Sequence, residues 1–110
     1  MRFLMTMNGG GPAADERLYA EMGTFIEELT RSGVLLATGG LGGDGTHMSA
    51  RDGKVTLTDG PYAEAKETIV SFALIDVRSK DEALELARRF WAIVGTGEGD
   101  MRQVYGPDGG

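Results

Sequence analysis

The chain has no cysteine and a single histidine, His47, among its 110 residues. Without cysteine there is no disulfide, no thiolate ligand for a metal ion and no cysteine nucleophile. One imidazole also excludes a metal site in which a single chain supplies several histidines. The composition therefore predicts no metal site, and it limits the possible chemistry without naming a reaction.

Positive charge is scarce as well, because 11 Lys and Arg stand against 17 Asp and Glu, which gives a net charge of −6. Proteins that hold a phosphate backbone or an anionic lipid surface rely on lysine and arginine. The acidic balance therefore argues against direct binding to nucleic acid or to a membrane. It suits contact with a basic partner protein.

Long hydrophobic runs are absent too. The apolar stretch at the N-terminus contains Thr6 and is too short for a signal-peptide core or a membrane span, so we expect a soluble cytoplasmic protein. The length fits one domain, expected over residues 1–106, with residues 107–110 as a disordered tail. The glycine-rich stretch 39–45 has no lysine and opens no helix, so we predict no nucleotide and no other bound cofactor.

Hydrophobic periodicity predicts two helices. The first has Asp15 as its N-cap, an apolar stripe from Leu18 to Leu29 and a stop at Gly33. The second opens with a capping box, in which Ser79 caps the backbone and Glu82 reaches back. We expect Glu85 and Arg89 to form an ion pair on its surface.

Strands are predicted between and around these helices. They cover residues 3–7, 34–38, 68–77 and 101–105, and a hairpin with arms 46–50 and 54–58 turns at Asp52-Gly53. The order of the elements predicts an α+β fold: a ferredoxin-like two-helix sandwich with an inserted β-hairpin.

Helices can cover only one face of such a sheet, yet Leu4, Val70, Phe72 and Leu74 make the other face apolar. A second copy of the chain is the simplest cover for that face, so we predict a homodimer with the sheets face to face. The alternative is that these side chains contact the hairpin and loops of the same chain.

The densest polar segment runs from Asp59 to Glu67. In a functional interpretation it lies at the mouth of a pocket, where Asp59 or Glu64 acts as acid or base and Lys66 holds an anionic group. Tyr62 belongs to the same candidate ligand-binding set. In the alternative interpretation the segment is a capped turn with solvated charges.

Two further residues are candidates outside this segment. His47 is a catalytic candidate because an imidazole can exchange protons near neutral pH, although a lone histidine on a hairpin arm is more often a surface or packing residue. Arg102 could point into the barrel and bind a carboxylate in bidentate fashion. It could equally pair with Glu98 or Asp100 on the surface.

The segment Asp59-Gly60-Pro61-Tyr62-Ala63-Glu64-Ala65-Lys66-Glu67 resembles the signature of the DGPF-motif branch of the YCII-related proteins, Asp-Gly-Pro-Phe-Ala-Glu-Thr-Lys-Glu. It departs from that signature at Tyr62 and Ala65. Similarity extends over nearly the whole chain, from the opening strand at Arg2 to the last strand around Arg102.

This resemblance implies a ferredoxin-like fold that dimerises into an α+β barrel, in a bacterial family that is largely uncharacterised. Members of this branch often accompany extracytoplasmic-function sigma factors. Some YCII-type proteins have a His–Asp pair with the histidine on the first helix, but no histidine lies between Asp15 and Ser32 here. That pair therefore has no counterpart in this chain.

Two functions remain open on the sequence. The chain is a small dimeric binding module for an organic ligand, held between the sheets, or for a regulatory partner such as a sigma factor. Alternatively, it is a cofactor-independent enzyme in which Asp59 or Glu64 moves a proton on a small carbonyl or phenolic substrate and Lys66 or Arg102 stabilises the anion.

Overall fold

The structure is a computed structural model that describes residues 1–9, 13–61 and 68–107. Its elements, in chain order, are β1 (Arg2–Asn8), α1 (Glu16–Arg31), β2 (Leu35–Gly40), β3 (Asp44–Arg51), β4 (Lys54–Pro61), β5 (Ile69–Asp76), α2 (Lys80–Val94) and β6 (Gly99–Val104). Neither helix is long and apolar enough to cross a membrane.

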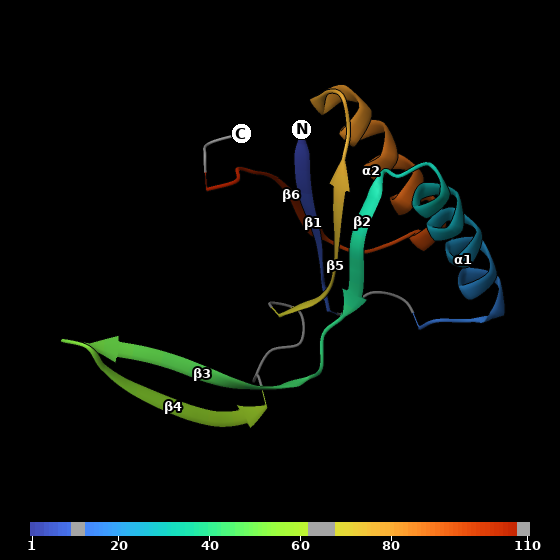
Figure 1. The fold of residues 1–110 in the computed structure, drawn as a ribbon. Helices are drawn as coiled ribbons and strands as arrows, with labels where there is room; N and C mark the ends of the chain where they lie inside the picture. The colour runs from blue at the N-terminus through green and yellow to red at the C-terminus, as the bar shows by residue number, and fades with distance from the viewer. Residues whose placement is uncertain (10–12, 62–67, 108–110) are drawn as a thin grey trace.

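The main sheet has four antiparallel strands in the order β2-β5-β1-β6, and both helices lie against one of its faces (Figure 1). This is the ferredoxin-like arrangement that the element order predicted. Strands β3 and β4 form a separate two-stranded sheet that projects away from the helices. The predicted α+β fold with an inserted hairpin is therefore confirmed, while its dimerisation stays a prediction.

The hydrophobic core occupies one end of the space between sheet and helices. Phe3 and Ile75 lie opposite each other on the central strands, and Ile75 is fully buried. They pack with Phe25 and Leu29 from the second half of α1, and with Ala83 and Leu86 from the first half of α2. The helices are thus held to the sheet by the end of α1 and the start of α2.

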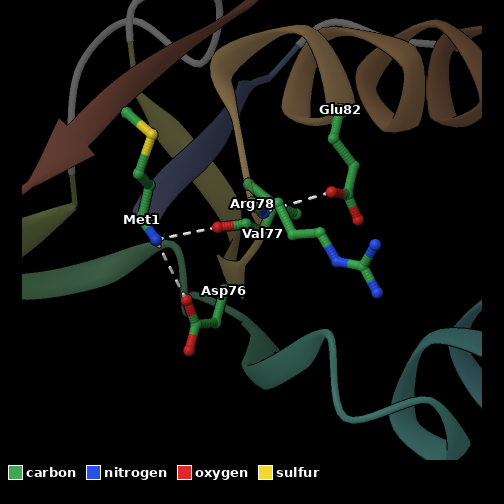
Figure 2. A network of polar contacts seen from close by, with 5 residues as sticks. All are labelled: Met1, Asp76, Val77, Arg78 and Glu82. Carbon is green, nitrogen blue, oxygen red and sulfur yellow. Dashed lines mark hydrogen bonds and ion pairs between the residues drawn. The ribbon is translucent and has the colours of Figure 1, made fainter.

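Both helix starts have the predicted caps. The carboxylate of Asp15 accepts a hydrogen bond from the backbone N–H of Leu18 at 2.8 Å, and the Ser79 hydroxyl oxygen accepts one from that of Glu82 at 3.1 Å. The Glu82 carboxylate reaches back one residue further than a standard capping box, to the N–H of Arg78 at 3.1 Å (Figure 2).

The N-terminus, which precedes β1, is bound to the chain next to this capping contact. The amino group of Met1 donates a hydrogen bond to the carbonyl oxygen of Val77 at 2.7 Å and lies 3.4 Å from the Asp76 carboxylate (Figure 2). These contacts join the first strand to the β5–α2 junction, next to the buried core.

The predicted ion pair between Glu85 and Arg89 is wrong. Arg88 pairs with Glu85 at 2.9 Å, whereas Arg89 reaches across to Glu28 of α1 at 2.7 Å. Helical spacing allows either arrangement, and the antiparallel packing of α1 beside α2 provides the second partner that the sequence pattern does not show.

The hairpin turns where it was predicted, with Asp52 at φ 51° and Gly53 at φ 80°. Two positive φ values match the turn type that fits the natural twist of a hairpin. The arms are longer than expected, because cross-strand pairing continues to Asp44 and Pro61. Likewise β6 begins at Gly99, two residues before its predicted start, since Gly99 pairs with Met7.

Candidate functional site

A cavity of about 790 Å³ opens between the sheet and the two helices, at the end opposite the core. It is bounded by α1 from Leu18 to Ile26, by the second half of α2, and by strands β1, β2, β5 and β6. The apolar stripe of α1 is divided between core and cavity. Phe25 and Leu29 are buried in the core, while Leu18, Met22 and Ile26 line the cavity.

Most of the lining is apolar. Four methionines, Met5, Met7, Met22 and Met101, contribute to it from β1, α1 and β6. Thioether side chains adapt their shape to a bound molecule and make favourable contacts with aromatic rings. Such a lining is typical of a site for a small organic molecule rather than for an ion.

Phe90 and Trp91 form an aromatic corner of the cavity. Their ring centroids are 5.1 Å apart and the planes meet at 83°, which is an edge-to-face pair. The indole also lies against Gly97 and Gly99, where the chain passes from α2 into β6. The missing side chain of Gly97 makes room for the ring, and that of Gly99 makes room for the Thr6 carbonyl oxygen and for the ring.

Polar groups at the cavity are few. The lining includes Thr6, Asn8, Thr38 and Ser71, and the Thr38 hydroxyl already donates a hydrogen bond to the Phe72 carbonyl at 2.8 Å. Tyr19 lies at the rim and is mostly exposed. Among the described lining residues no Lys, Arg or His occurs, and Asp100 is the one carboxylate. The cavity therefore offers a few neutral polar groups and no cationic partner for an anion.

Among the described residues, the two groups with a shifted pKa, Glu28 and Arg89, lie outside the cavity. The hydrogen bond from Arg89 holds the pKa of Glu28 below its usual range, and the same bond raises the pKa of Arg89. The Arg89 guanidinium also lies 4.9 Å above the centre of the Phe25 ring. This pair joins the two helices on the outside of the molecule, so it has a structural rather than a chemical role.

Two of the predicted site residues lie on the projecting hairpin. Asp59 faces Thr46 across the strands and accepts a hydrogen bond from its hydroxyl. His47 pairs in register with Thr58, and its side chain is exposed. Neither residue belongs to the lining of the cavity.

Arg102 lies on β6 between Met101 and Gln103 and pairs with Leu4 on β1. Because side chains alternate along a strand, Arg102 and Leu4 belong to the face of the sheet that the helices leave open. Among the described residues Arg102 has no ion-pair partner, so the pairing with Glu98 or Asp100 is absent.

Tyr62, Glu64 and Lys66 lie outside the described residues. Of the candidate set, the structure thus places Asp59, His47 and Arg102, and it brings none of them to the cavity. The sequence pattern does not reveal the cavity, because an apolar helix face such as the one that carries Trp91 can either pack in a core or line a cavity. In the part of the chain that the structure describes, no group of three or more metal-ligating side chains occurs.

Comparison with known proteins gives a family and a fold. The family model of the YCII-related domain matches residues 1–104. A solved structure of 5-chloro-2-hydroxyhydroquinone dehydrochlorinase from Burkholderia phenoliruptrix AC1100, in complex with 2,5-dihydroxybenzoquinone, aligns over 100% of both chains with a TM-score of 0.50 and 15% identity. That likeness supports the fold.

A curated relative is an uncharacterized protein of Rhizobium meliloti (strain 1021). It is 53% identical over 36 residues, which are 33% of this chain and 29% of the relative. The match therefore spans less than a third of that protein's length.

Proposed function

Because the chain belongs to the YCII-related domain family, we propose that it uses the cavity between the sheet and the helices to bind a small organic molecule. The single observation that carries this proposal is the cavity itself. Its volume of about 790 Å³ lies within the range of roughly 300–1,000 Å³ that is usual for small-molecule sites. The solved relative of this fold, which was studied with a bound quinone, supports the same reading.

The methionines provide a test with its own control. Met5, Met7, Met22 and Met101 line the cavity, whereas Met1 and Met48, the other two of the 6 methionines, do not. We expect the methyl NMR signals of the first four to shift when hydroquinone or 2-naphthol is added to methyl-labelled protein. The signals of Met1 and Met48 should stay in place. Absence of any cavity shift at millimolar probe, or shifts at Met48 alone, would contradict the proposal.

A second candidate function is association with another copy of the chain. Met48, Val55 and Leu57 on the hairpin are 72%, 65% and 64% exposed. Met48 pairs with Leu57 and Ala50 with Val55, so these apolar side chains form one stripe along one face of the hairpin. We define this set as the hairpin stripe. A homodimer that also covers Leu4 and its cross-strand neighbour Leu74 on the open sheet face would remove both apolar surfaces from water.

Sedimentation measures this association. We expect a dimer in the wild-type protein and a shift towards monomer in Leu57→Lys, which places a charge in the hairpin stripe. Thr56→Lys, on the other face of the same strand, is the matched control and should remain dimeric. A monomeric wild-type protein would contradict the homodimer. The partner to test for these two apolar surfaces would then be a regulatory protein, such as a sigma factor.

An enzymatic role for Asp59 and Arg102 depends on that dimer. Asp59 and Arg102 lie away from the cavity within one chain, so a site built from them needs the second copy to bring the hairpin and the open sheet face together. If Arg102 binds a ligand carboxylate there, Arg102→Ala should weaken binding of benzoate to the dimer and leave 2-naphthol binding in the cavity unchanged. Equal binding of benzoate by both proteins would refute this role.

A further inference from the structure

The indole of Trp91 sits in a notch made by two glycines. A Cβ atom at Gly99 would lie 2.1 Å from the Thr6 carbonyl oxygen and 3.1 Å from the indole ring, and one at Gly97 would lie 2.8 Å from the ring. Side chains do not approach so closely, so any residue other than glycine at position 97 would push the ring aside. Gly97 also has φ +153°, at the edge of the backbone region that favours glycine. The notch therefore fixes where the ring lies.

The ring is also held from the side of the helix. Phe90 packs edge-to-face against it, with centroids 5.1 Å apart. Both rings line the cavity and both are half-buried, so part of their surface faces the empty space. A rigid aromatic wall of this kind favours flat aromatic partners, which can stack or pack edge-on against it.

The rest of the lining narrows the class of ligand further. The described lining residues include no cationic side chain and one carboxylate, in a chain of net charge −6. An anionic ligand would lose its hydration without gaining a partner. The volume of about 790 Å³ lies in the upper half of the usual range, so one six-membered ring would leave much of the cavity unfilled.

From these observations we propose that Trp91, positioned by Gly97 and Gly99, is the specificity-determining wall of the cavity. It selects a flat aromatic molecule of two or more rings that carries no negative charge. This inference rests on the proposed function and deepens it, because it names the class of ligand and the residue that selects it.

Gly97→Ala tests the wall, with Gly95→Ala as its matched control. Gly95 has φ +90°, so alanine strains the backbone there as well, but no atom lies within 4 Å of its would-be Cβ. We expect Gly97→Ala to weaken 2-naphthol binding at least tenfold, because the displaced indole enters the cavity. Gly95→Ala should bind within about twofold of wild type. Binding is followed by the methionine methyl signals, which do not depend on the tryptophan.

Trp91→Phe keeps the test decisive if Gly97→Ala does not fold. This variant retains an aromatic side chain but shortens the wall, and it should weaken 2-naphthol binding several-fold. In the wild-type protein 2-naphthoate, which has the same rings and a negative charge, should bind at least tenfold more weakly than 2-naphthol, and hydroquinone should bind more weakly too.

The outcomes separate the two proposals. If neither hydroquinone nor 2-naphthol shifts the cavity methyl signals of wild-type protein, the proposed function fails. If 2-naphthol binds the wild type but equally well to Trp91→Phe and Gly97→Ala, the cavity is a site and Trp91 is not its selecting wall. Equal binding of 2-naphthoate or of hydroquinone would overturn the ligand class.

Discussion

At the scale of single residues, Arg89 shows how one side chain connects two helices. Its guanidinium donates a hydrogen bond to Glu28 at 2.7 Å and lies 4.9 Å from the centre of the Phe25 ring. Both charged side chains are about half exposed, at 48% and 53%, so water and salt weaken their attraction. The contact positions α2 against α1 more than it adds to stability.

This contact predicts a pH dependence. Folding lowers the pKa of the Glu28 carboxyl, mainly through the hydrogen bond from Arg89. A lowered pKa stabilises the folded state above the unfolded pKa, and this stabilisation is lost as the pH falls through the folded pKa. Glu28→Gln should therefore be slightly less stable than wild type at pH 7, and the gap should close as the pH falls below 4.5, the ordinary value of this carboxyl.

Urea unfolding at several pH values measures that gap. Glu27→Gln is the neighbouring control, because the partner of Glu27 is Arg31 on the same helix. A gap for Glu28→Gln that persists undiminished at strongly acidic pH would show that the carboxylate charge is not its cause.

At the scale of elements, the β3–β4 hairpin stands apart from the rest of the fold. It pairs only with itself in the described sheets and projects away from the helices (Figure 1). An isolated two-stranded hairpin is marginally stable in water. The stability of this hairpin therefore depends on its turn and on any partner that covers it.

Two glycines of similar backbone conformation test this independence. Gly53 of the hairpin turn has φ +80°, and Gly33, which follows α1, has φ +79°. Alanine in this left-handed region costs about 1–2 kcal/mol. Gly53→Ala should speed amide hydrogen exchange in β3 and β4 by about fivefold or more and leave the main unfolding transition in place. Gly33→Ala should lower the melting temperature of the whole molecule. A drop of similar size for Gly53→Ala would show that the hairpin unfolds together with the rest.

At the scale of the whole molecule, the space between sheet and helices has a packed end and an open end. Ile75, Phe3 and Leu29 belong to the packed end, whereas Leu18, Met22 and Trp91 line the cavity. Stability therefore depends mainly on the first group, and ligand recognition depends on the second. The two functions of the apolar residues are separated along the helix axes.

Substitutions along one strand measure this division. Ile75 is fully buried, while Ile69 at the start of the same strand is 43% exposed. Ile75→Ala should lower the free energy of unfolding by about 2–5 kcal/mol, because it leaves a void in the packed end. Ile69→Ala should cost less than about 1 kcal/mol, because little apolar area is lost. Denaturant unfolding compares the two, and equal losses would show that the core is not concentrated around Ile75.

Much of the fold follows from local patterns. The caps at Asp15 and Ser79 and the turn at Asp52-Gly53 occur where the residues predicted them, because each depends on a few neighbours in the chain. The partner of Arg89 could not be predicted from such a pattern. Both Glu85 and Glu28 were within reach, and the packing of the helices determines that Glu28 is the partner.

The candidate site was less accessible to the same reasoning. Asp59 was predicted as a site residue because it begins the densest polar segment of the chain, yet the structure places it on the hairpin beside Thr46. The cavity is lined by residues such as Met22 and Trp91 that a periodic pattern cannot tell from core. Periodicity shows which face of a helix is apolar, but it does not show how far that face lies from the sheet.

By itself, then, the amino-acid sequence determined the order of the strands and helices, the ferredoxin-like fold and the apolar stripes of both helices. These depend on local geometry and on the need to bury one face of each element. Only the tertiary structure decided which part of each stripe is packed and which faces the cavity, and that Gly97 and Gly99 seat the Trp91 ring. These depend on distances between segments far apart in the chain, which no local pattern contains.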